Sequence, residues 1–416
     1  MADTQFTRKT CRLCGSDHLV LGLPLKPTPL ADAYIPKDQL KPQEIYPLDL
    51  MLCESCGHVQ TGTVVYPEEI YINYIYETTS SVGLPKHFVQ YADQVLARAQ
   101  FQTPKLVLDI GSNDGTLLKC FKARGMSVLG VDPAREIARR ATEAGIETLG
   151  TFFNTDLAKH IVEKYGQASI MTSNNLVANV DDLDDFFSGI RTVLAPDGYF
   201  FFESFYLADF IQNMVFDFAY HEHLSYFSVK PIQQFVRKHG LELVDVEAIK
   251  TKGGSLRYVI RHQAAGQASS PTVAHYIEQE QAMGVQTLQG LTAFADKILE
   301  VKANVRNYLQ SCQAQGLKIA GYGASATSTT LVYHFGLGDF LDYFVDEYQA
   351  KQGLYSPGLH LPVYSPEVLS QAETKPDVVL VLAWRFAEGI IAKNQAFLAA
   401  GGQFAVPLPQ LNIIKG

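Results

Sequence analysis

The chain has 416 residues, 47% of them hydrophobic, and a formal net charge of −9 at pH 7. That length exceeds what one hydrophobic core serves, so two or three domains are expected. The acidic balance argues against broad nucleic-acid binding, which needs Lys and Arg in excess, and no apolar run reaches membrane-spanning length. The first ten residues lack the apolar core of a secretion signal, so we expect a cytoplasmic protein.

Two Cys-x-x-Cys pairs lie near the N-terminus, about forty residues apart, and each is followed by glycine. Four thiolates offered from two tight turns match tetrahedral zinc, and a site closed by four cysteines leaves no coordination position open for catalysis. The sequence therefore predicts a structural zinc module, with a short strand over residues 46–52 leading to the second pair. The predicted ligands are Cys11, Cys14, Cys53 and Cys56.

Residues 66–100 are rich in aromatics and then predict a helix over residues 85–99. Short apolar segments follow at residues 106–111, 127–133, 168–174 and 198–204, separated by segments with helical patterns. Strands that alternate with helices predict an α/β fold, here a Rossmann-type, mostly parallel sheet. A polar linker is expected at residues 263–272 and one long helix over 272–314. A second α/β unit begins with the strand and glycine turn of residues 317–328.

A cofactor site is predicted where the strand at residues 106–111 ends in an acid and a Gly-x-x-x-Gly turn. The spacing differs from the dinucleotide pattern Gly-x-Gly-x-x-Gly, which weakens an NAD interpretation. Asp132, at the end of the next strand, can accept hydrogen bonds from ribose hydroxyls. At this point the chain resembles methyltransferases that use S-adenosylmethionine (SAM). The candidate cofactor residues are Asp109, Gly111, Asn113, Gly115, Asp132, Phe152, Asn174 and Asn175.

Residues 216–227 form the densest cluster of reactive side chains, with Tyr220, His221, Glu222 and His223 in succession. Two histidines two residues apart can bind a metal on an extended segment, but no third ligand is evident nearby. Acid–base chemistry is the better use, because histidine titrates near neutrality and a neighbouring carboxylate tunes its basicity.

Across its whole length the chain resembles the sugar-nucleotide C-methyltransferase family, because it carries that family's motifs in the same order. These are the cysteine pairs, the SAM turn, the tyrosines near residue 76, the stretch at 220–223 and the C-terminal Gly-x-Gly-Ala-Ser turn. The family implies methylation at C3 of a nucleotide-linked 4-keto-6-deoxy sugar. By this resemblance His223 removes the C3 proton, Glu222 holds the sugar or tunes the histidine, and Tyr76 orients the sugar or stabilises the oxyanion.

The resemblance also implies that the C-terminal unit helps to bind the nucleotide diphosphate. Asn179 and Lys252 depart from the family, because histidine is common at both positions, and this leaves the configuration of the sugar and the proton relay open. The nucleobase is open as well: the resemblance implies thymidine as the default, with guanosine and cytidine as alternatives. The candidate substrate residues are Tyr220, Asn179, Lys252, Arg257, Tyr322, Ala324, Ser325 and Lys351; Arg385 is a weaker one.

We therefore expect a zinc module at residues 1–65, a SAM-dependent methyltransferase domain at 66–265 and a Rossmann-like nucleotide-sugar domain at 266–416. The expected partner is a nucleotide-diphosphate sugar, without nucleic acid or membrane, and the expected state is a monomer or homodimer. Two alternatives remain at this stage. One is O- or N-methylation of another small molecule, and the other is a non-enzymatic zinc-knuckle scaffold.

Overall fold

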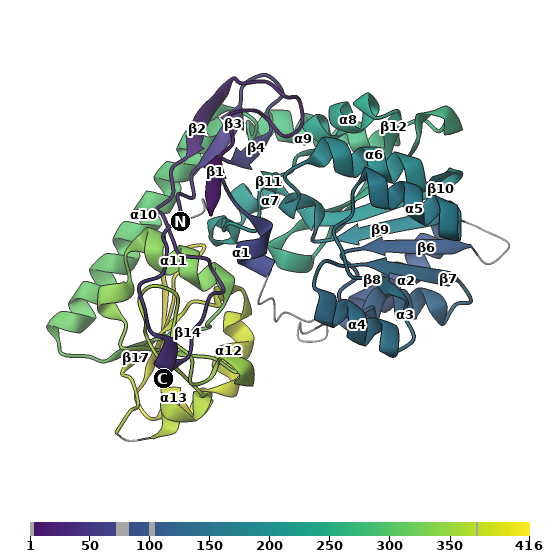
Figure 1. The fold of residues 1–416 in the computed structure, drawn as a ribbon. Helices are drawn as coiled ribbons and strands as arrows, with labels where there is room; N and C mark the ends of the chain where they lie inside the picture. The colour runs from purple at the N-terminus through teal and green to yellow at the C-terminus, as the bar shows by residue number, and fades with distance from the viewer. Residues whose placement is uncertain (1–3, 72–82, 100–104, 372) are drawn as a thin grey trace.

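The computed structural model describes residues 4–71, 83–99, 105–371 and 373–416. Figure 1 shows a small N-terminal module, a larger α/β unit beside it, and a C-terminal α/β unit that the long helix α10 connects to the module. Within the described residues no helix combines the length and apolar character needed to cross a bilayer.

The N-terminal module contains an antiparallel sheet in the order β11-β4-β3-β2. Its edge strand β11 comes from the middle of the chain and pairs with β4, with Ser225 opposite Gln60. The expected strand over residues 46–52 is present but begins only at Leu50. The bounds are β1 (Gln5–Thr7), β2 (Leu19–Leu23), β3 (Leu50–Cys53), β4 (Val59–Thr61), β5 (Thr63–Val65), α1 (Pro67–Tyr71) and β11 (Ser225–Tyr226).

The larger α/β unit has a seven-stranded sheet in the order β12-β13-β10-β9-β6-β7-β8. The strands from β10 to β8 are parallel, as the alternation of strands and helices predicts, whereas β12 and β13 add an antiparallel edge. The strands are β6 (Leu106–Ile110), β7 (Ser127–Val131), β8 (Thr148–Leu149), β9 (Ala168–Asn174), β10 (Leu194–Phe205), β12 (Leu241–Ile249) and β13 (Ser255–His262).

Helices pack on this sheet through short apolar stripes. On α2, for example, Phe88, Tyr91, Ala92 and Val95 are buried at helical spacing. The helices of this unit are α2 (Leu84–Ala99), α3 (Thr116–Lys122), α4 (Arg135–Glu143), α5 (Thr155–Tyr165), α6 (Leu183–Val193), α7 (Leu207–Gln212) and α8 (Val229–Lys238).

The prediction of one long helix over residues 272–314 was wrong. The segment forms α9 (Pro271–Met283) and α10 (Leu288–Ala314), with Gly284 between them at φ +65°. Glycine adopts this left-handed conformation without the strain that a Cβ would cause, and it ends α9. Thr287 then caps α10, since its side chain accepts a hydrogen bond from the Gly290 amide at 3.1 Å.

The C-terminal unit has a six-stranded sheet in the order β16-β15-β14-β17-β18-β19, parallel except for the edge strand β19. The α/β fold class with two Rossmann-like units is therefore confirmed. The strands are β14 (Ile319–Tyr322), β15 (Tyr343–Val345), β16 (Val363–Tyr364), β17 (Val378–Val381), β18 (Gln403–Val406) and β19 (Asn412–Lys415). The helices are α11 (Ala326–Phe335), α12 (Ala387–Lys393) and α13 (Gln395–Ala399).

Residues 26–48, between β2 and β3, leave the N-terminal module and run along the C-terminal unit. The Lys26 amide donates to His334 Nδ1 at 3.2 Å, and Thr329 Oγ1 donates to the Ala31 carbonyl at 2.7 Å. Ile35 and Tyr355 form an isolated β-bridge. The N-terminal part of the chain therefore contacts both α/β units.

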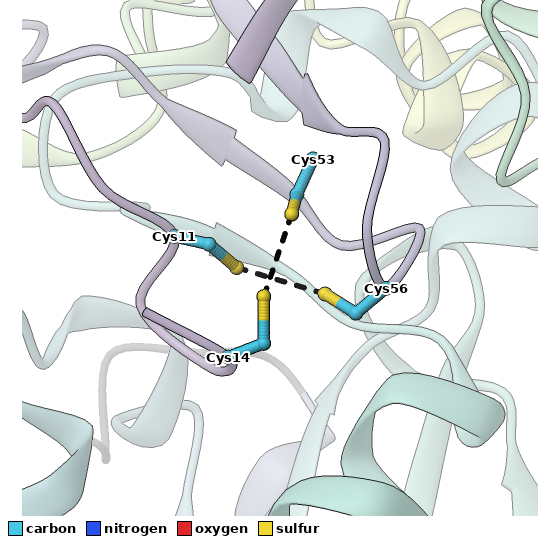
Figure 2. A group of neighbouring side chains, drawn as sticks. All are labelled: Cys11, Cys14, Cys53 and Cys56. Carbon is cyan, nitrogen blue, oxygen red and sulfur yellow. Dashed lines mark hydrogen bonds between the residues drawn. The ribbon is translucent and has the colours of Figure 1, made fainter. Parts of the chain in front are cut away.

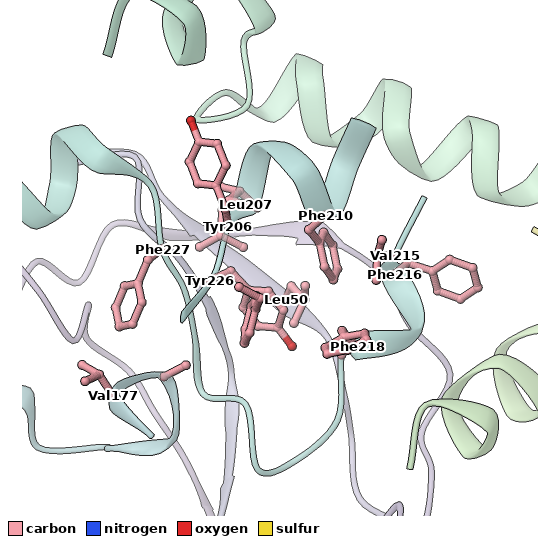
Figure 3. Packing of buried hydrophobic residues seen from close by; sticks show 14 of the residues in the cluster. Leu50, Val177, Tyr206, Leu207, Phe210, Val215, Phe216, Phe218, Tyr226 and Phe227 are labelled. Carbon is pink, nitrogen blue, oxygen red and sulfur yellow. The ribbon is translucent and has the colours of Figure 1, made fainter. Parts of the chain in front are cut away.

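The largest buried cluster spans all three parts and underlies the segment that carries the predicted reaction centre. Figure 3 shows Leu50 of β3 among aromatic side chains that precede and follow that centre in the chain, including Phe218 and Tyr226. The Phe210 and Tyr226 rings, for example, lie 5.2 Å apart edge to face. Close packing of this kind fixes the backbone on both sides of residues 220–223.

Candidate active site and zinc site

The four predicted zinc ligands come together from two turns, one after β1 and one that begins at Cys53, the last residue of β3 (Figure 2). Their sulfur atoms lie within 4.8 Å of one another; Cys11 Sγ is 3.6 Å from Cys56 Sγ, and Cys14 Sγ is 3.5 Å from Cys53 Sγ. A tetrahedral ion with metal–sulfur bonds of about 2.3 Å requires edges of about 3.8 Å, so the donor set fits zinc closely.

A large cavity of about 2220 Å³ lies between the larger α/β unit and the C-terminal unit. A pocket for one small molecule usually measures about 300–1,000 Å³, so this cavity has room for two ligands. Side chains from both Rossmann-like units and from residues 26–48 line it. Of the predicted site residues, those that line the cavity are Asp109, Gly111, Asn113, Asp132, Phe152, Asn174, Asn175, Asn179, Tyr220, Glu222, His223, Lys252, Tyr322, Ala324, Ser325 and Lys351.

The cofactor side of the cavity is formed by the carboxyl ends of β6, β7 and β9. Gly111 has φ +78°, and a Cβ there would lie 3.1 Å from the Leu176 side chain, so only glycine fits this turn. The Asp132 carboxylate accepts hydrogen bonds from the Asn113 amide at 2.8 Å and the Ala134 amide at 2.9 Å. Each carboxylate oxygen has a second lone pair for a ribose hydroxyl, so these residues fit SAM.

Burial is the main influence on the pKa of the two aspartates on the cofactor side, Asp109 and Asp132. It raises the pKa of Asp109 to about 7, although Thr172 Oγ1 donates to its carboxylate at 2.6 Å. Burial also raises the pKa of Asp132, and the two amide hydrogen bonds oppose that shift. Phe152 is 46% exposed, which leaves its ring accessible to a ligand at the edge of the cavity.

His223 has a fixed tautomer in an aromatic enclosure. Its Nδ1 lies 2.7 Å from the Phe218 carbonyl, which can only accept, so Nδ1 carries the hydrogen and Nε2 a lone pair. The ring centroid is 4.0 Å from that of Tyr220 and 4.7 Å from that of Phe205. Burial lowers the pKa of His223 to about 3, and the nearby Lys252 adds to this, so the imidazole is neutral at pH 7.

Glu222 lies next to His223 among charges of both signs. Burial raises the pKa of Glu222 to about 7; Asp32 raises it further, whereas Lys252 and Lys351 oppose the shift. Lys252 has a left-handed backbone, at φ 56°, which is uncommon for a residue other than glycine or asparagine. Burial lowers the pKa of Lys252, and Arg385 contributes by charge repulsion.

The opposite side of the cavity repeats the geometry of the cofactor side. The Asp346 carboxylate accepts from the Ala324 amide at 2.6 Å and from the Tyr348 amide at 2.7 Å. Asp132 accepts in the same way: one hydrogen bond comes from the backbone amide of Asn113 in the glycine turn, and the other from the backbone amide of Ala134, two residues after Asp132. Tyr322 donates to Glu347 at 3.1 Å, and Lys351 Nζ donates to Asp32 at 2.5 Å and to the Ala324 carbonyl at 2.6 Å.

Arg257, predicted to bind phosphate, lies instead in the protein interior and does not line the cavity. Its guanidinium donates to Glu203 Oε1 from Nε at 2.9 Å and from Nη2 at 2.7 Å, and lies 4.2 Å from the centre of the Tyr91 ring. Its Nη1 donates to Gln94 at 2.8 Å and to Glu247 at 3.1 Å. We correct this prediction, because the guanidinium already serves internal partners.

A second predicted residue, Gly115, also does not line the cavity. Gly115 caps α3 at φ +74° and faces Ile146 rather than the cavity. Its role is to turn the backbone into the helix. Tyr76 lies outside the described residues.

Three cavity-lining residues were missed or given little weight by sequence reasoning. Asp32 comes from the segment that runs along the C-terminal unit. His87 of α2 lines the cofactor side and is 2.9 Å from Glu203. Arg385 stacks 4.2 Å over the Phe218 ring and lies 3.5 Å from Asp217. No local motif marks Asp32 or His87, since each depends on partners distant in the chain.

Comparison with known proteins defines the class. A methyltransferase domain matches residues 86–246, and a zinc binding domain matches residues 11–71. The protein is thus a SAM-dependent methyltransferase with a zinc module, and both predicted cofactors, SAM and zinc, are confirmed.

The family follows from two further matches. A C-methyltransferase C-terminal domain matches residues 250–409. C-methyltransferase NovU of Streptomyces niveus is 32% identical over 407 residues, which cover 97% of this chain and 96% of NovU. The chain belongs to this C-methyltransferase family.

Solved structures with similar folds cover about half of the chain. The PH0226 protein of Pyrococcus horikoshii OT3 is 14% identical, covers 47% of this chain and 98% of its own, and has a TM-score of 0.36. Magnesium protoporphyrin IX methyltransferase of Synechocystis PCC 6803, solved with bound SAH, is 14% identical over 47% of this chain and 92% of its own, with a TM-score of 0.34. These distant likenesses add no weight to the assignment.

Proposed function

We propose that the protein transfers the methyl group of SAM to C3 of a nucleotide-linked 4-keto-6-deoxy sugar, with His223 as the base. The observation that carries the proposal is the hydrogen bond from His223 Nδ1 to the Phe218 carbonyl, inside a cavity with room for two ligands. It leaves the Nε2 lone pair as the proton acceptor. A carbonyl at C4 makes the neighbouring C3–H acidic, and an imidazole that is neutral at pH 7 has its Nε2 lone pair available to accept that proton.

The charged residues around His223 can balance the charge that forms. When Nε2 takes the C3 proton, the C3–H electron pair enters the enolate, which has its negative charge on O4. The Lys252 ammonium can stabilise that oxygen, and the Glu222 carboxylate can stabilise the new imidazolium. SAM supplies the methyl group as an electrophile: the C3–CH3 bond forms as the sulfur–methyl bond breaks. Tyr220 packs on the imidazole and limits its rotation.

A nucleotide on the C-terminal side is supported by the repeated carboxylate geometry. Asp132 and Asp346 each accept two backbone hydrogen bonds. One comes from an amide in the glycine turn of the same unit, and the other from the amide two residues after the aspartate. If Asp132 binds the SAM ribose, the same chemistry lets Asp346 bind the pentose of the nucleotide. Tyr322, Ala324, Ser325 and Lys351 of the C-terminal unit also line the cavity, as does Asn179 of the larger unit. We also retain the domain limits 1–65, 66–265 and 266–416 as proposals.

Product analysis tests the proposal. The enzyme is incubated with SAM and, in turn, with the 4-keto-6-deoxy sugars of dTDP, GDP and CDP, and products are analysed by mass spectrometry and NMR. We expect one added methyl group, on C3. The matched control is the same sugar with the 4-keto group reduced to a hydroxyl, which cannot form the enolate. Methylation of that control, or methyl transfer to oxygen or nitrogen, would exclude carbon chemistry through the enolate.

A second measurement isolates the base. With SAH in place of SAM, the accepted substrate in D₂O should exchange its C3 hydrogen for deuterium. His223→Gln should abolish that exchange while SAM affinity stays within about threefold of wild type. Exchange at the wild-type rate in this variant would remove His223 from the role of base.

A further inference from the structure

Arg12 lies between two zinc ligands, Cys11 and Cys14, yet its side chain is among the most buried in the protein. Only 2% of the residue is exposed. A buried guanidinium is costly unless its hydrogen bonds and its charge are matched by partners. The partners of Arg12 therefore indicate why a charged residue occupies this position.

Those partners connect the zinc turn to the segment that carries the proposed base. Arg12 Nη1 donates to the Thr61 carbonyl at 2.9 Å and to the Leu224 carbonyl at 3.2 Å. Leu224 directly follows His223. The Thr61 amide donates to the same Leu224 carbonyl at 3.0 Å, so β4 and Arg12 both fix the position of this peptide group.

The same guanidinium also contacts the loop that follows Asn179. Arg12 Nε donates to Asp181 Oδ1 at 2.9 Å. The Leu224 amide donates to the Ala178 carbonyl at 2.8 Å, so the loop and the base segment are themselves hydrogen-bonded. Arg12 thus contacts both backbone segments that present His223 and Asn179 to the cavity.

The backbone of Arg12 is fixed by the turn that presents the cysteines. The backbone amide of Arg12 donates to Gln60 Oε1 at 2.8 Å. In the sequence Arg12 lies between Cys11 and Cys14, whose sulfur atoms belong to the predicted zinc site. Zinc with four thiolates carries a net charge of −2, opposite in sign to the guanidinium, which interacts by charge with Cys11. A bound metal would therefore hold this turn, and with it Arg12, in one position.

We propose that Arg12 is a positioning residue, which couples the geometry of the zinc site to the orientation of His223 through the Leu224 carbonyl. The zinc module then serves the active site directly as well as stabilising the fold. The inference rests on the proposed role of His223 as base. A displacement of about 1 Å at a catalytic group costs on the order of a hundredfold in rate, and this sets the expected effect.

The test compares Arg12→Met with Arg8→Met. Arg8 pairs with the same Asp181, Nη1 to Oδ2 at 2.8 Å, whereas the bond to the Leu224 carbonyl comes from Arg12, so Arg8 is the matched control. We expect Arg12→Met to keep one zinc per chain and its SAM affinity, and to lose on the order of a hundredfold in kcat. Arg8→Met should retain kcat within about threefold.

The ¹⁵N signals of His223, assigned with His223→Gln, provide a readout that needs no substrate. In the wild type they should report hydrogen on Nδ1 and none on Nε2. In Arg12→Met they should shift or show a mixture of tautomers, with no such change in Arg8→Met. If Arg12→Met does not fold, Arg12→Lys takes its place, because lysine keeps the charge but cannot reach all three acceptors.

Unchanged His223 signals together with wild-type kcat, in a folded Arg12 variant that holds zinc, would overturn the inference. An equal loss in the Arg8 and Arg12 variants would also overturn it, by placing the effect in the Asp181 ion pair. Failure of the proposed function looks different: no nucleotide-linked keto sugar is methylated, or His223→Gln stays active. The ¹⁵N signals still decide the coupling in that case.

Discussion

Arg257→Met tests whether the buried arginine is structural, as its contacts indicate, or binds phosphate, as the sequence suggests. The substitution removes both bonds from the guanidinium to Glu203, a carboxylate that is 1% exposed, and leaves it the contact with His87 Nε2 at 2.9 Å. Breaking a buried ion pair at one partner costs about 3–5 kcal/mol. For a domain of this size that corresponds to a fall in melting temperature of roughly 6–20 °C.

Two measurements are made: the melting temperature by calorimetric unfolding, and the nucleotide affinity by titration with dTDP, GDP and CDP. Arg261→Met is the control, because Arg261 lies on the same strand and donates to partly exposed partners such as Gln267 at 2.8 Å. It should cost about 1 kcal/mol or less. Adding Glu203→Gln to Arg257→Met should recover part of the loss, since no charge is then left buried alone.

A refuting result has a clear form. If Arg257→Met melts within about 2 °C of wild type but loses nucleotide affinity, the guanidinium binds ligand and the structural account is wrong.

Three further predictions concern the cofactor, the metal and pH. Asp132→Ala should weaken SAM binding at least about tenfold by calorimetry with no change in zinc content, and unchanged affinity would mean that the ribose contact is misassigned. Cys53→Ser should release zinc and lower the melting temperature; retention of one zinc per chain, measured by plasma mass spectrometry, would contradict the four-thiolate site. Because burial raises the pKa of Glu222 to about 7, its carboxylate ionises only as pH rises through that value, so kcat/KM should rise through about pH 7. His223 stays neutral there, since its pKa is lowered to about 3, whereas the pKa of Asp109 on the cofactor side is also raised to about 7. Glu222→Gln should therefore remove the part of the rise that Glu222 causes, and an unchanged rise in this variant would assign it to another group.

The parts of the site that follow from local sequence were predictable. The zinc ligands, Gly111 and Asp132 belong to short motifs whose spacing determines their geometry, and the mostly parallel sheet follows from the alternation of strands and helices. The break at Gly284 was also local, since a glycine followed by a capping threonine marks the end of one helix and the start of another.

The residues that could not be predicted depend on partners far along the chain. Arg257 in an apolar strand looks like a ligand site until Glu203, 54 positions away, is placed beside it. Asp32 reaches the cavity, and Arg12 reaches the peptide that follows His223, because residues 26–48 and the zinc turn fold against distant segments. Periodicity and spacing describe neighbours in sequence and carry no information about such contacts.

The sheet that β4 and β11 share has a consequence for synthesis of the protein. About 160 residues separate Thr61 from Ser225, so a ribosome adding roughly 5–20 residues per second leaves the outer side of β4 uncovered for roughly 8–33 s. An uncovered strand edge invites pairing with another nascent chain. Because β4 has only three residues, it offers little length for such mispairing.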